Sequence, residues 1–324
     1  MRSLSGVQPS GRLHLGNYFG AIRQYLKLQS EGHECFYFIA NYHALTTIRN
    51  KAELEKITLH VATAYLAMGI DPERSVFFLQ SDVPQVTELA WVLNCLCPVS
   101  MMEKAVSYKD KLVRGLTANM GLLDYPVLQA ADIVIYDANI VPVGADQKQH
   151  LEMTRDLAVK FNMAYGEVLV VPEPYIVQEV AVVPGLDGQK MSKSYGNEIE
   201  IFQSPKQTRR RCARIVTDPT PLEAPKDPDK CTVYALLKLL ASEQEADEIA
   251  AKYRAGGYGY GQAKARLAEL INEHFAPARE KYAALEADPD YVRDVLRAGG
   301  RKAREVAEAT LERVREATGI VTTY

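Results

Sequence analysis

The chain has 324 residues and a formal net charge of -3, and 47% of its residues are hydrophobic. This length and composition are typical of a globular protein with one sizeable domain and a smaller second one. The slight negative charge argues against a protein that coats nucleic acid, although a local basic patch would be enough to bind an RNA. The sequence has neither an N-terminal apolar h-region nor a run of about 18 apolar residues, so we expect no secretion and no membrane partner.

The cysteines indicate the compartment. There are five, an odd number, and they sit mostly in apolar settings. Cys95 and Cys97 lack zinc spacing, and no Cys/His cluster follows them. Buried thiols of this kind are usually structural. We therefore expect a reduced, cytoplasmic protein without a structural metal.

Strand-like and helix-like segments alternate through the first half of the chain. Apolar runs at 4–7, 35–40 and 76–80 predict three strands, and a fourth run starts at 140 and ends in a glycine turn. Helical patterns follow from Leu15 and fill 51–68 and 84–96, where Trp91 is expected in the core. An insertion at about 84–120 is expected to lie over the site, and 180–183 is a candidate last strand. The order predicts an α/β fold with a Rossmann-like, doubly wound parallel sheet.

The first strand is followed by turn chemistry and then by a helix. Gln8-Pro9-Ser10-Gly11 is the turn, and the helix starts near Leu15. Unpaired N–H groups at a helix N-terminus, set against the carboxyl end of a strand, form an anion site. His14 and Asn17 share one face of the first turn. A lone histidine is usually structural, but this spacing is better explained by a phosphate contact.

A second informative stretch is 121–136. From Pro126 it is typical of a helix with proline at an early position. Tyr125, Gln129 and Asp132 then share a face. Apolar neighbours predict that Asp132 is buried, and a buried carboxylate needs a partner. That partner is either an N–H of a ligand, such as an indole, or nearby backbone.

The loop 188–197 contains Lys190-Met191-Ser192-Lys193-Ser194 between glycines. Two ammonium groups with hydroxyl donors can clamp a polyphosphate whose charge grows in a transition state. An arbitrary pair of lysines at this spacing is more often a solvated basic turn.

From Pro205 the chain changes to charged amphipathic helices, predicted at 205–213, 232–254, 262–286 and 291–317. Arg209, Arg210 and Arg211, with Lys206 and Arg214, form a basic patch that is either an RNA contact or a solvated helix face. The glycine-rich run 256–261 follows a helix and not a strand, so it is not a nucleotide loop.

Together these motifs resemble a known family. Lys190 to Ser194 are identical to the second signature of class I aminoacyl-tRNA synthetases, and His14-Leu15-Gly16-Asn17 resembles the first. The class usually ends that signature in histidine, whereas the tryptophanyl branch commonly has asparagine. The residues around this signature, and residues 141–157, are similar to the corresponding segments of bacterial tryptophanyl-tRNA synthetases.

The resemblance implies a catalytic domain at 1–185, the signature loop and its connection at 186–204, and a helical anticodon-binding region at 205–324. The last helix of that region is expected to pack back on the catalytic domain. The implied activity joins L-tryptophan to tRNA(Trp) through a tryptophanyl-adenylate, releasing AMP and pyrophosphate. Mg²⁺ would arrive with ATP, and the implied assembly is a homodimer.

The family's functional residues carry over by position. The implied catalytic residues are Lys190, Lys193, His14 and Asn17. The implied ATP-binding residues are Gln8, Pro9, Ser10, His14, Gly16, Asn17, Lys109, Lys111, Gly144, Asp146, Gln147, Lys190, Met191, Ser192, Lys193 and Ser194. The implied tryptophan-binding residues are Leu4, Gly6, Gln8, His43, Tyr125, Gln129, Asp132, Val141, Val143 and Gln147.

Two alternatives stay open. Tyr125, Gln129 and Asp132 also resemble the amino-acid site of some tyrosyl-tRNA synthetases, and many tryptophanyl enzymes have methionine where this chain has Gln129. The sequence of residues 141–157 favours tryptophan as the substrate. A non-catalytic, tRNA-binding relative would be expected to have damaged signatures, and both signatures of this chain are intact.

Overall fold

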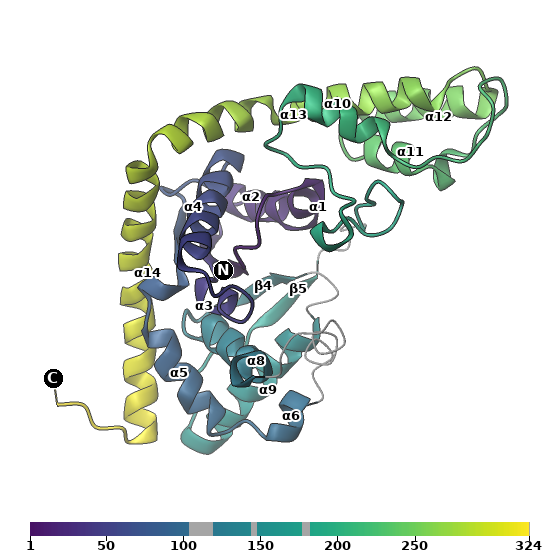
Figure 1. Cartoon of the computed structure of the whole chain (residues 1–324). Helices are drawn as coiled ribbons and strands as arrows, with labels where there is room; N and C mark the ends of the chain where they lie inside the picture. The colour runs from purple at the N-terminus through teal and green to yellow at the C-terminus, as the bar shows by residue number, and fades with distance from the viewer. Residues whose placement is uncertain (104–118, 144–147, 177–181, 324) are drawn as a thin grey trace.

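In the computed structural model, which describes residues 1–103, 119–143, 148–176 and 182–323, the apolar runs of the first half form a parallel sheet. Among these residues the sheet has five strands in the order β3-β2-β1-β4-β5 (Figure 1). The strands are β1 Arg2–Val7, β2 Glu34–Ile39, β3 Ser75–Leu79, β4 Ile140–Val143 and β5 Glu173–Ile176. Chain order reverses at β1, so the predicted doubly wound parallel sheet is confirmed.

Helices cover both faces of this sheet. They are α1 Leu15–Asn17, α2 Arg23–Ser30, α3 Asn41–Ala44, α4 Lys51–Met68, α5 Gln85–Asn94, α6 Val99–Glu103, α8 Met120–Val134 and α9 Lys148–Tyr165. A π-helical turn, Tyr18–Ile22, joins α1 to α2. The bounds of α4 match the predicted 51–68, because Asn50 accepts the N–H of Glu53 at one end and Gly69 takes a positive φ of 115° at the other.

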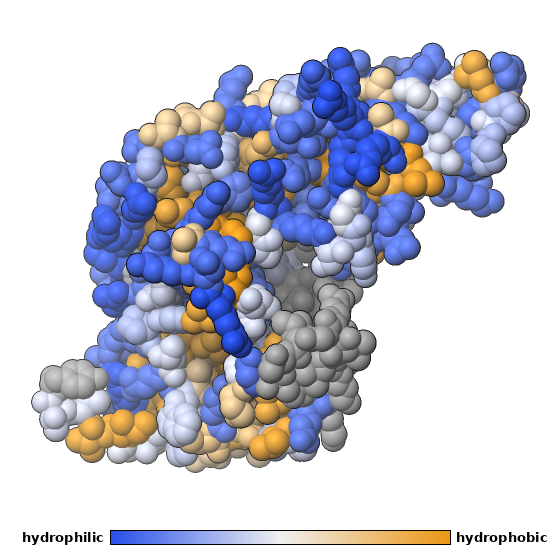
Figure 2. All heavy atoms as spheres, viewed as in Figure 1, coloured by the Kyte–Doolittle hydropathy of each residue, from blue (hydrophilic) through white to orange (hydrophobic). Residues whose placement is uncertain are grey.

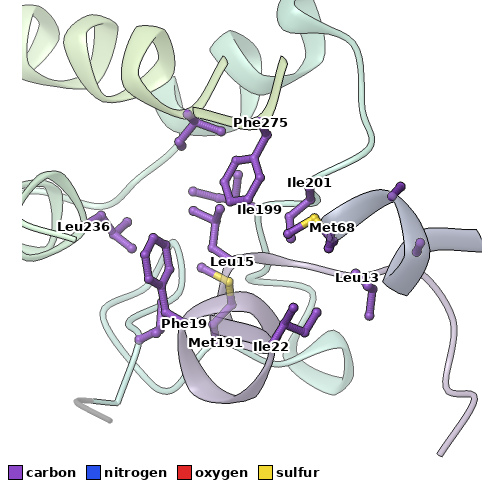
Figure 3. Close-up of a cluster of buried hydrophobic side chains, with 14 of the residues drawn as sticks. Leu13, Leu15, Phe19, Ile22, Met68, Met191, Ile199, Ile201, Leu236 and Phe275 are labelled. Carbon is purple, nitrogen blue, oxygen red and sulfur yellow. The ribbon is translucent and has the colours of Figure 1, made fainter. Parts of the chain in front are cut away.

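Alternation of side chains along the strands divides the core into two clusters. Phe36 and Phe38 of β2 point to the face covered by α8 and α9, while Tyr37 and Ile39 point to the face covered by α2 and α4. The cluster that contains Tyr37 and Ile39 reaches well beyond the sheet. Figure 3 shows Leu15 beside Met191 of the signature loop and Phe275 of a C-terminal helix. One apolar cluster therefore packs against both signature segments and the helical region.

The C-terminal part of the chain is helical. Its helices are α10 Pro205–Ala213, α11 Thr232–Leu237, α12 Glu243–Ala255, α13 Tyr260–Ala287 and α14 Pro289–Thr318. Helices α10, α11 and α12 gather around the first part of α13, away from the sheet (Figure 1). A proline at the first helical position and a capping box between Ser204 and Gln207 start α10.

Helix α14 runs back along the sheet and covers its edge strand, β3 (Figure 1). The approach is close because Gly299 faces the strand and Gly300 faces Asp82 in the turn that follows it: a Cβ on Gly299 would lie 2.0 Å from the carbonyl oxygen of Phe77. The Arg304 guanidinium also donates to the carbonyl of Asp82, at 3.0 Å from Nε. This contact shields a strand edge whose backbone groups would otherwise be open to pairing with another chain.

Several predicted elements differ from the structure. The predicted helix 232–254 is two helices, since Ser242 caps α12 by accepting the N–H of Glu245. Helix α8 starts six residues before Pro126, at Met120, where Asn119 caps it. Strand β5 was not predicted, and the candidate strand at 180–183 lies partly outside the described residues.

The prediction that Trp91 belongs to the core is wrong, because 70% of this side chain is exposed on the folded chain. Within the described ranges, no helix combines the length and apolarity needed to cross a membrane.

Candidate functional site

The site lies where the central strands end. The carboxyl ends of β1, β2 and β3 lead directly into residues 8–14, helix α3 and the turn Gln80–Asp82. Strand order reverses next to β1, and crevices of this kind are where open α/β sheets bind their ligands.

The two signature segments are paired in space. The N–H of Leu15 donates to the carbonyl of Ile199 at 3.0 Å, and the N–H of Ile201 donates to the carbonyl of Leu13 at 3.0 Å. Lys193 reaches across to the first segment, with its ammonium 2.7 Å from the carbonyl oxygen of Ser10. Groups 183 positions apart in the chain therefore form one surface.

This pairing corrects one expectation. The sequence predicts free N–H groups at the start of the first helix, but the Leu15 N–H is already bonded, and α1 has only three residues before the π-helical turn. An anion at this position would rely on side chains and on Lys193 more than on a helix N-terminus.

Close packing explains the glycine of the first signature. A Cβ on Gly16 would lie 2.9 Å from His14 Nδ1 and 3.4 Å from the Cβ of Met191. Met191 is itself buried in the apolar cluster of Figure 3. The close approach is to the His14 ring, so the glycine is required by the packing of that ring, while a Cβ would make only an ordinary contact with Met191.

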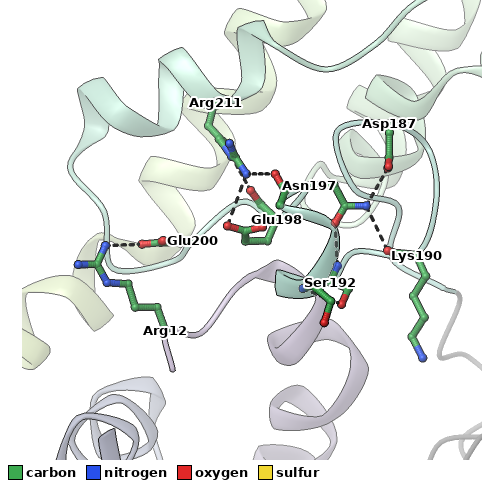
Figure 4. Close-up of polar contacts among 10 residues, drawn as sticks. Arg12, Asp187, Lys190, Ser192, Asn197, Glu198, Glu200 and Arg211 are labelled. Carbon is green, nitrogen blue, oxygen red and sulfur yellow. Dashed lines mark hydrogen bonds and ion pairs between the residues drawn. The ribbon is translucent and has the colours of Figure 1, made fainter. Parts of the chain in front are cut away.

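Asn197 and Arg211 hold the signature loop in shape (Figure 4). The Asn197 side-chain Oδ1 accepts the N–H of Ser192 at 2.8 Å, while the side-chain Nδ2 donates to Asp187 at 2.7 Å and to the carbonyl of Lys190 at 3.2 Å. Arg211 donates to the carbonyls of Glu198 at 2.7 Å and Gly196 at 2.5 Å. In Figure 4 the Lys190 side chain extends away from this frame.

The electrostatics of the first signature keep its histidine neutral. Burial is the largest effect and the Lys193 ammonium adds to it, lowering the pKa of His14 to about 4. The pKa of Lys193 is also lowered by burial, against the opposing charges of Glu198 and Glu200. Asn17 Oδ1 accepts the backbone N–H of His14 at 3.0 Å. A neutral imidazole can thus lie beside a cation without repelling it.

Asp132 is at the other end of the site. It is buried as predicted, and its partners are two side chains. Gln80 Nε2 donates to both carboxylate oxygens, at 2.8 and 2.9 Å, and His43 Nε2 lies 2.8 Å from Oδ2. Burial raises the pKa of Asp132, while the bonds from His43 and Gln80 oppose that rise. Gln80 is fixed in turn by the backbone N–H of Tyr42 at 3.0 Å.

Other residues expected at the amino-acid end lie in the central strands, in α8 and after β1. Gly6 is exposed although it lies in the central strand, and a Cβ there would meet the Phe38 ring at 2.4 Å. Tyr125 Oη lies 2.9 Å from His150 Nε2. Gln129 is half-buried in the middle of α8. Leu4 and Val141 are buried in the cluster under α8, and Gln8 donates weakly to the carbonyl of His43 at 3.4 Å.

Some expected residues cannot be placed. Lys109, Lys111, Gly144, Asp146 and Gln147 lie outside the described residues, as does the side chain of Val143. Pro9 and Ser10 follow β1, and Ser192 and Ser194 flank Lys193 in the loop. In the part of the chain that is described, no cluster of three or more His, Cys, Asp or Glu is arranged to hold a metal.

Sequence reasoning gave no role to three residues that shape the site, Gln80, His150 and Asn197, and it considered Arg211 only as part of a basic patch, either an RNA contact or a solvated helix face. Gln80 carries the one usable signal, because it is a polar residue at the carboxyl end of an apolar strand. Asn197 ends the predicted loop, but its three bonds depend on contacts that spacing does not reveal.

Comparison with known proteins adds to this geometry. The family described as tRNA synthetases class I (W and Y) matches residues 1–276. The chain belongs to this family. The predicted resemblance to its tryptophanyl branch is confirmed by the individual relatives.

Two relatives are 51% identical to the chain. The tryptophan–tRNA ligase of Fusobacterium nucleatum matches over 323 residues, covering 99% of this chain and 98% of the relative. That of Rhodopirellula baltica matches over 320 residues, covering 99% and 100%. The crystal structure of tryptophanyl-tRNA synthetase from Campylobacter jejuni, complexed with ADP and tryptophan, has a TM-score of 0.93 at 48% identity and covers 99% of this chain and 100% of its own.

The juxtaposition of His14 and Lys193 can be tested by pH titration. In an NMR titration the His14 ring is expected to protonate with a midpoint near pH 4, because burial and Lys193 both disfavour the imidazolium. Lys193→Ala removes the cation and should raise this midpoint, but not to 6.5, because burial remains the larger cause. Lys190→Ala is the matched control and should leave the midpoint in place. Equal shifts in both variants would contradict the observed pairing of the signatures.

Proposed function

We propose that this protein is a tryptophan–tRNA ligase, which activates L-tryptophan with ATP and transfers the acyl group to tRNA(Trp). The observation that carries the proposal is the joined pair of signatures at the carboxyl edge of the sheet, with the buried Asp132 at the same edge. The crystal structure of the Campylobacter relative contains ADP and tryptophan, which belong to the same chemical classes as the two proposed substrates, ATP and tryptophan.

The first step is a displacement at phosphorus. The tryptophan carboxylate oxygen attacks the α-phosphate of ATP, a new O–P bond forms, and the bond to the β-phosphate oxygen breaks to release pyrophosphate. The protein has to align two anions and stabilise charge that builds on the phosphates. Lys193 and Lys190 supply positive charge, and a neutral His14 and the Asn17 amide supply hydrogen bonds to the phosphate oxygens.

The rest of the ATP site is proposed on the same basis. Gln8, Ser10, Ser192 and Ser194 present polar groups near the paired signatures, Gly16 leaves room for the His14 ring, and Met191 is buried in the apolar cluster; Pro9 is assigned to the same site. We assign base, ribose and further phosphate contacts to Gly144, Asp146, Gln147, Lys109 and Lys111. Mg²⁺ enters with ATP as part of the substrate.

Asp132 selects the amino acid. Gln80 and His43 orient its carboxylate, which keeps lone pairs that can accept the N–H of an indole. Gly6, Leu4, Val141 and Val143 border the slot. Gln8, Tyr125, Gln129 and Gln147 are assigned to the polar end of tryptophan. A site built to bond a buried N–H can reject a side chain lacking it by roughly 10⁴–10⁵.

The second step uses the rest of the molecule. After adenylate formation, the 3′-terminal ribose of tRNA attacks the acyl carbon and AMP leaves. We assign catalysis to 1–185, the loop and its connection to 186–204, and anticodon recognition to the helices from 205. A cytoplasmic location follows from the use of tRNA.

The two alternatives from the sequence are disfavoured. Relatives that are 48–51% identical over nearly the whole chain are tryptophan enzymes, which speaks against tyrosine as the substrate. A non-catalytic role does not explain two intact signatures in contact.

Asp132→Asn tests the selector. Because the charged acceptor for the indole is removed without changing shape, kcat/KM for tryptophan in ATP–pyrophosphate exchange should fall about 10- to 150-fold, with little change in KM for ATP. Asp124→Asn is the matched control: it lies on the same helix, is half-buried, and bonds to Asn94 at 3.0 Å. Unchanged tryptophan exchange in Asp132→Asn, or exchange with tyrosine by the natural chain, would contradict the assignment.

We also propose a homodimer, because large apolar side chains gather on neighbouring helices. Trp91 of α5, Val99 of α6, Met120 of α8 and Met163 of α9 are 70%, 66%, 73% and 83% exposed. Helix α8 packs against each of the other three. Exposed apolar side chains on helices that pack together can form an interaction site, and a second copy is the simplest partner.

Trp91 is the only tryptophan in the sequence, so it reports on this interface directly. Sedimentation should show a dimer. The fluorescence emission of Trp91 should lie at a shorter wavelength than that of a solvated indole. Trp91→Glu should weaken dimerisation by roughly 30-fold or more, as for a central aromatic anchor. Val216→Glu, at an equally apolar and 63% exposed position after α10, should have no effect. A stable monomer, or a dimer unaffected by Trp91→Glu, would refute the proposed interface.

A further inference from the structure

A second candidate site lies beside α10, outside the residues assigned to ATP and tryptophan. A surface cavity of about 180 Å³ is lined by Gln203, Gln207, Arg210, Arg211 and Arg214. Pockets that enclose a drug-sized molecule usually measure roughly 300–1,000 Å³. This cavity is therefore suited to a single small group rather than to a whole nucleotide.

The groups that face the cavity are donors. Arg210 and Arg214 form no ion pair with any residue in the described part of the chain, so their charge is uncompensated. Gln203 Nε2 is buried and has no hydrogen-bond partner there. The side-chain oxygen of Gln207 accepts the N–H of Ser204 at 2.9 Å, which leaves its amide nitrogen to donate. The guanidinium groups of Arg210 and Arg214 and the two amides favour an anion with several acceptor oxygens, whereas the charge of Arg211 is already paired with the Glu198 carboxylate at 3.5 Å.

The surroundings indicate that this anion belongs to a large molecule. Lys206 and Arg209 of the same helix are exposed next to the cavity, and they extend its positive charge over the surface. Figure 2 shows strongly hydrophilic atoms around α10. A run of arginines and lysines along one exposed helix is the footprint of a nucleic-acid backbone.

We propose that this cavity binds one backbone phosphate of tRNA. The inference rests on the proposed function, since it names a further contact with that enzyme's RNA substrate. A phosphodiester offers two unbridged oxygens, which match the fork of a guanidinium. The contact carries no base information, so it positions the RNA and does not select it.

Arg211 connects this contact to the signature loop. Its guanidinium lines the cavity and also donates to the carbonyls of Gly196 and Glu198, at the end of the loop (Figure 4). A phosphate held by Arg210 and Arg214 would lie next to the group that fixes the loop. Arg211 is thus a positioning residue for the loop, whereas Arg210 and Arg214 are free to act on RNA alone.

The test uses the double variant Arg210→Ala/Arg214→Ala in the full chain. Its KM for tRNA(Trp) in aminoacylation should rise at least about tenfold, because two charged hydrogen-bond donors to one phosphate are lost. The slope of log affinity against log salt should fall in magnitude by about 1. Tryptophan-dependent ATP–pyrophosphate exchange, which needs no tRNA, should keep its rate and its KM values for ATP and pyrophosphate.

Two variants sharpen the result. Arg209→Ala removes a positive charge from the same helix, at a residue that does not line the cavity. It should raise the KM for tRNA by less than about twofold. Arg211→Lys keeps a charge but loses the two-carbonyl contact, so it should lower the exchange rate as well as weaken tRNA binding.

The outcomes separate the two proposals. Suppose that the natural chain catalyses exchange and that the double variant aminoacylates tRNA as well as the natural chain does. This result would overturn the cavity assignment alone. A changed KM for ATP or pyrophosphate in the double variant would show that the cavity serves a small phosphate and would also overturn it. No exchange by the natural chain would instead overturn the proposed function.

Discussion

The contact between residues 13–15 and 199–201 determines how the rest of the site is arranged. It brings together two loops that are separated in sequence by most of the sheet, and the entropy cost of closing so long a loop must be offset by burial. The side chains whose burial offsets this entropy cost are Leu13, Leu15, Met191, Ile199 and Ile201. They share one apolar cluster with side chains of α11 and α13. The chemistry of the loops is thus stabilised by packing that reaches into the helical region.

The same contact sets the electrostatics. A lysine held at a carbonyl next to a buried histidine would be unfavourable if both were charged, and the low pKa of His14 removes that conflict. At the other end, the carboxylate of Asp132 is buried with two side-chain donors in place of water. The first-signature end of the site therefore has a neutral histidine in place before any ligand arrives, which is a condition for electrostatic preorganisation.

Strands β1 to β4, the fold class and the family could be predicted because their signals are local. An apolar run, an Asn cap and a Gly stop define α4 within the sequence itself, and five letters identify the signature loop. The errors share a different cause. Trp91 has the pattern of a core residue, but periodicity shows only that a side chain is apolar and not which surface covers it. The break before α12 was missed because a Ser cap resembles any serine between helical segments.

Long-range partners were beyond the same reasoning. Gln80 bonds to Asp132 across 52 positions and Arg211 bonds to Gly196 across 15, and no spacing rule relates either pair. The sequence therefore offered candidates for the chemical groups of the site, but not the residues that orient them.

The most direct measurement is a double-mutant cycle between the two signatures. His14→Asn, Lys193→Ala and the double variant would be compared in the single-turnover rate of tryptophanyl-adenylate formation. If the signatures act as one unit, the two losses should be non-additive by about 0.5–3 kcal/mol. Additivity to within about 0.5 kcal/mol would show that the two groups act independently, and would contradict the central role of the contact between them.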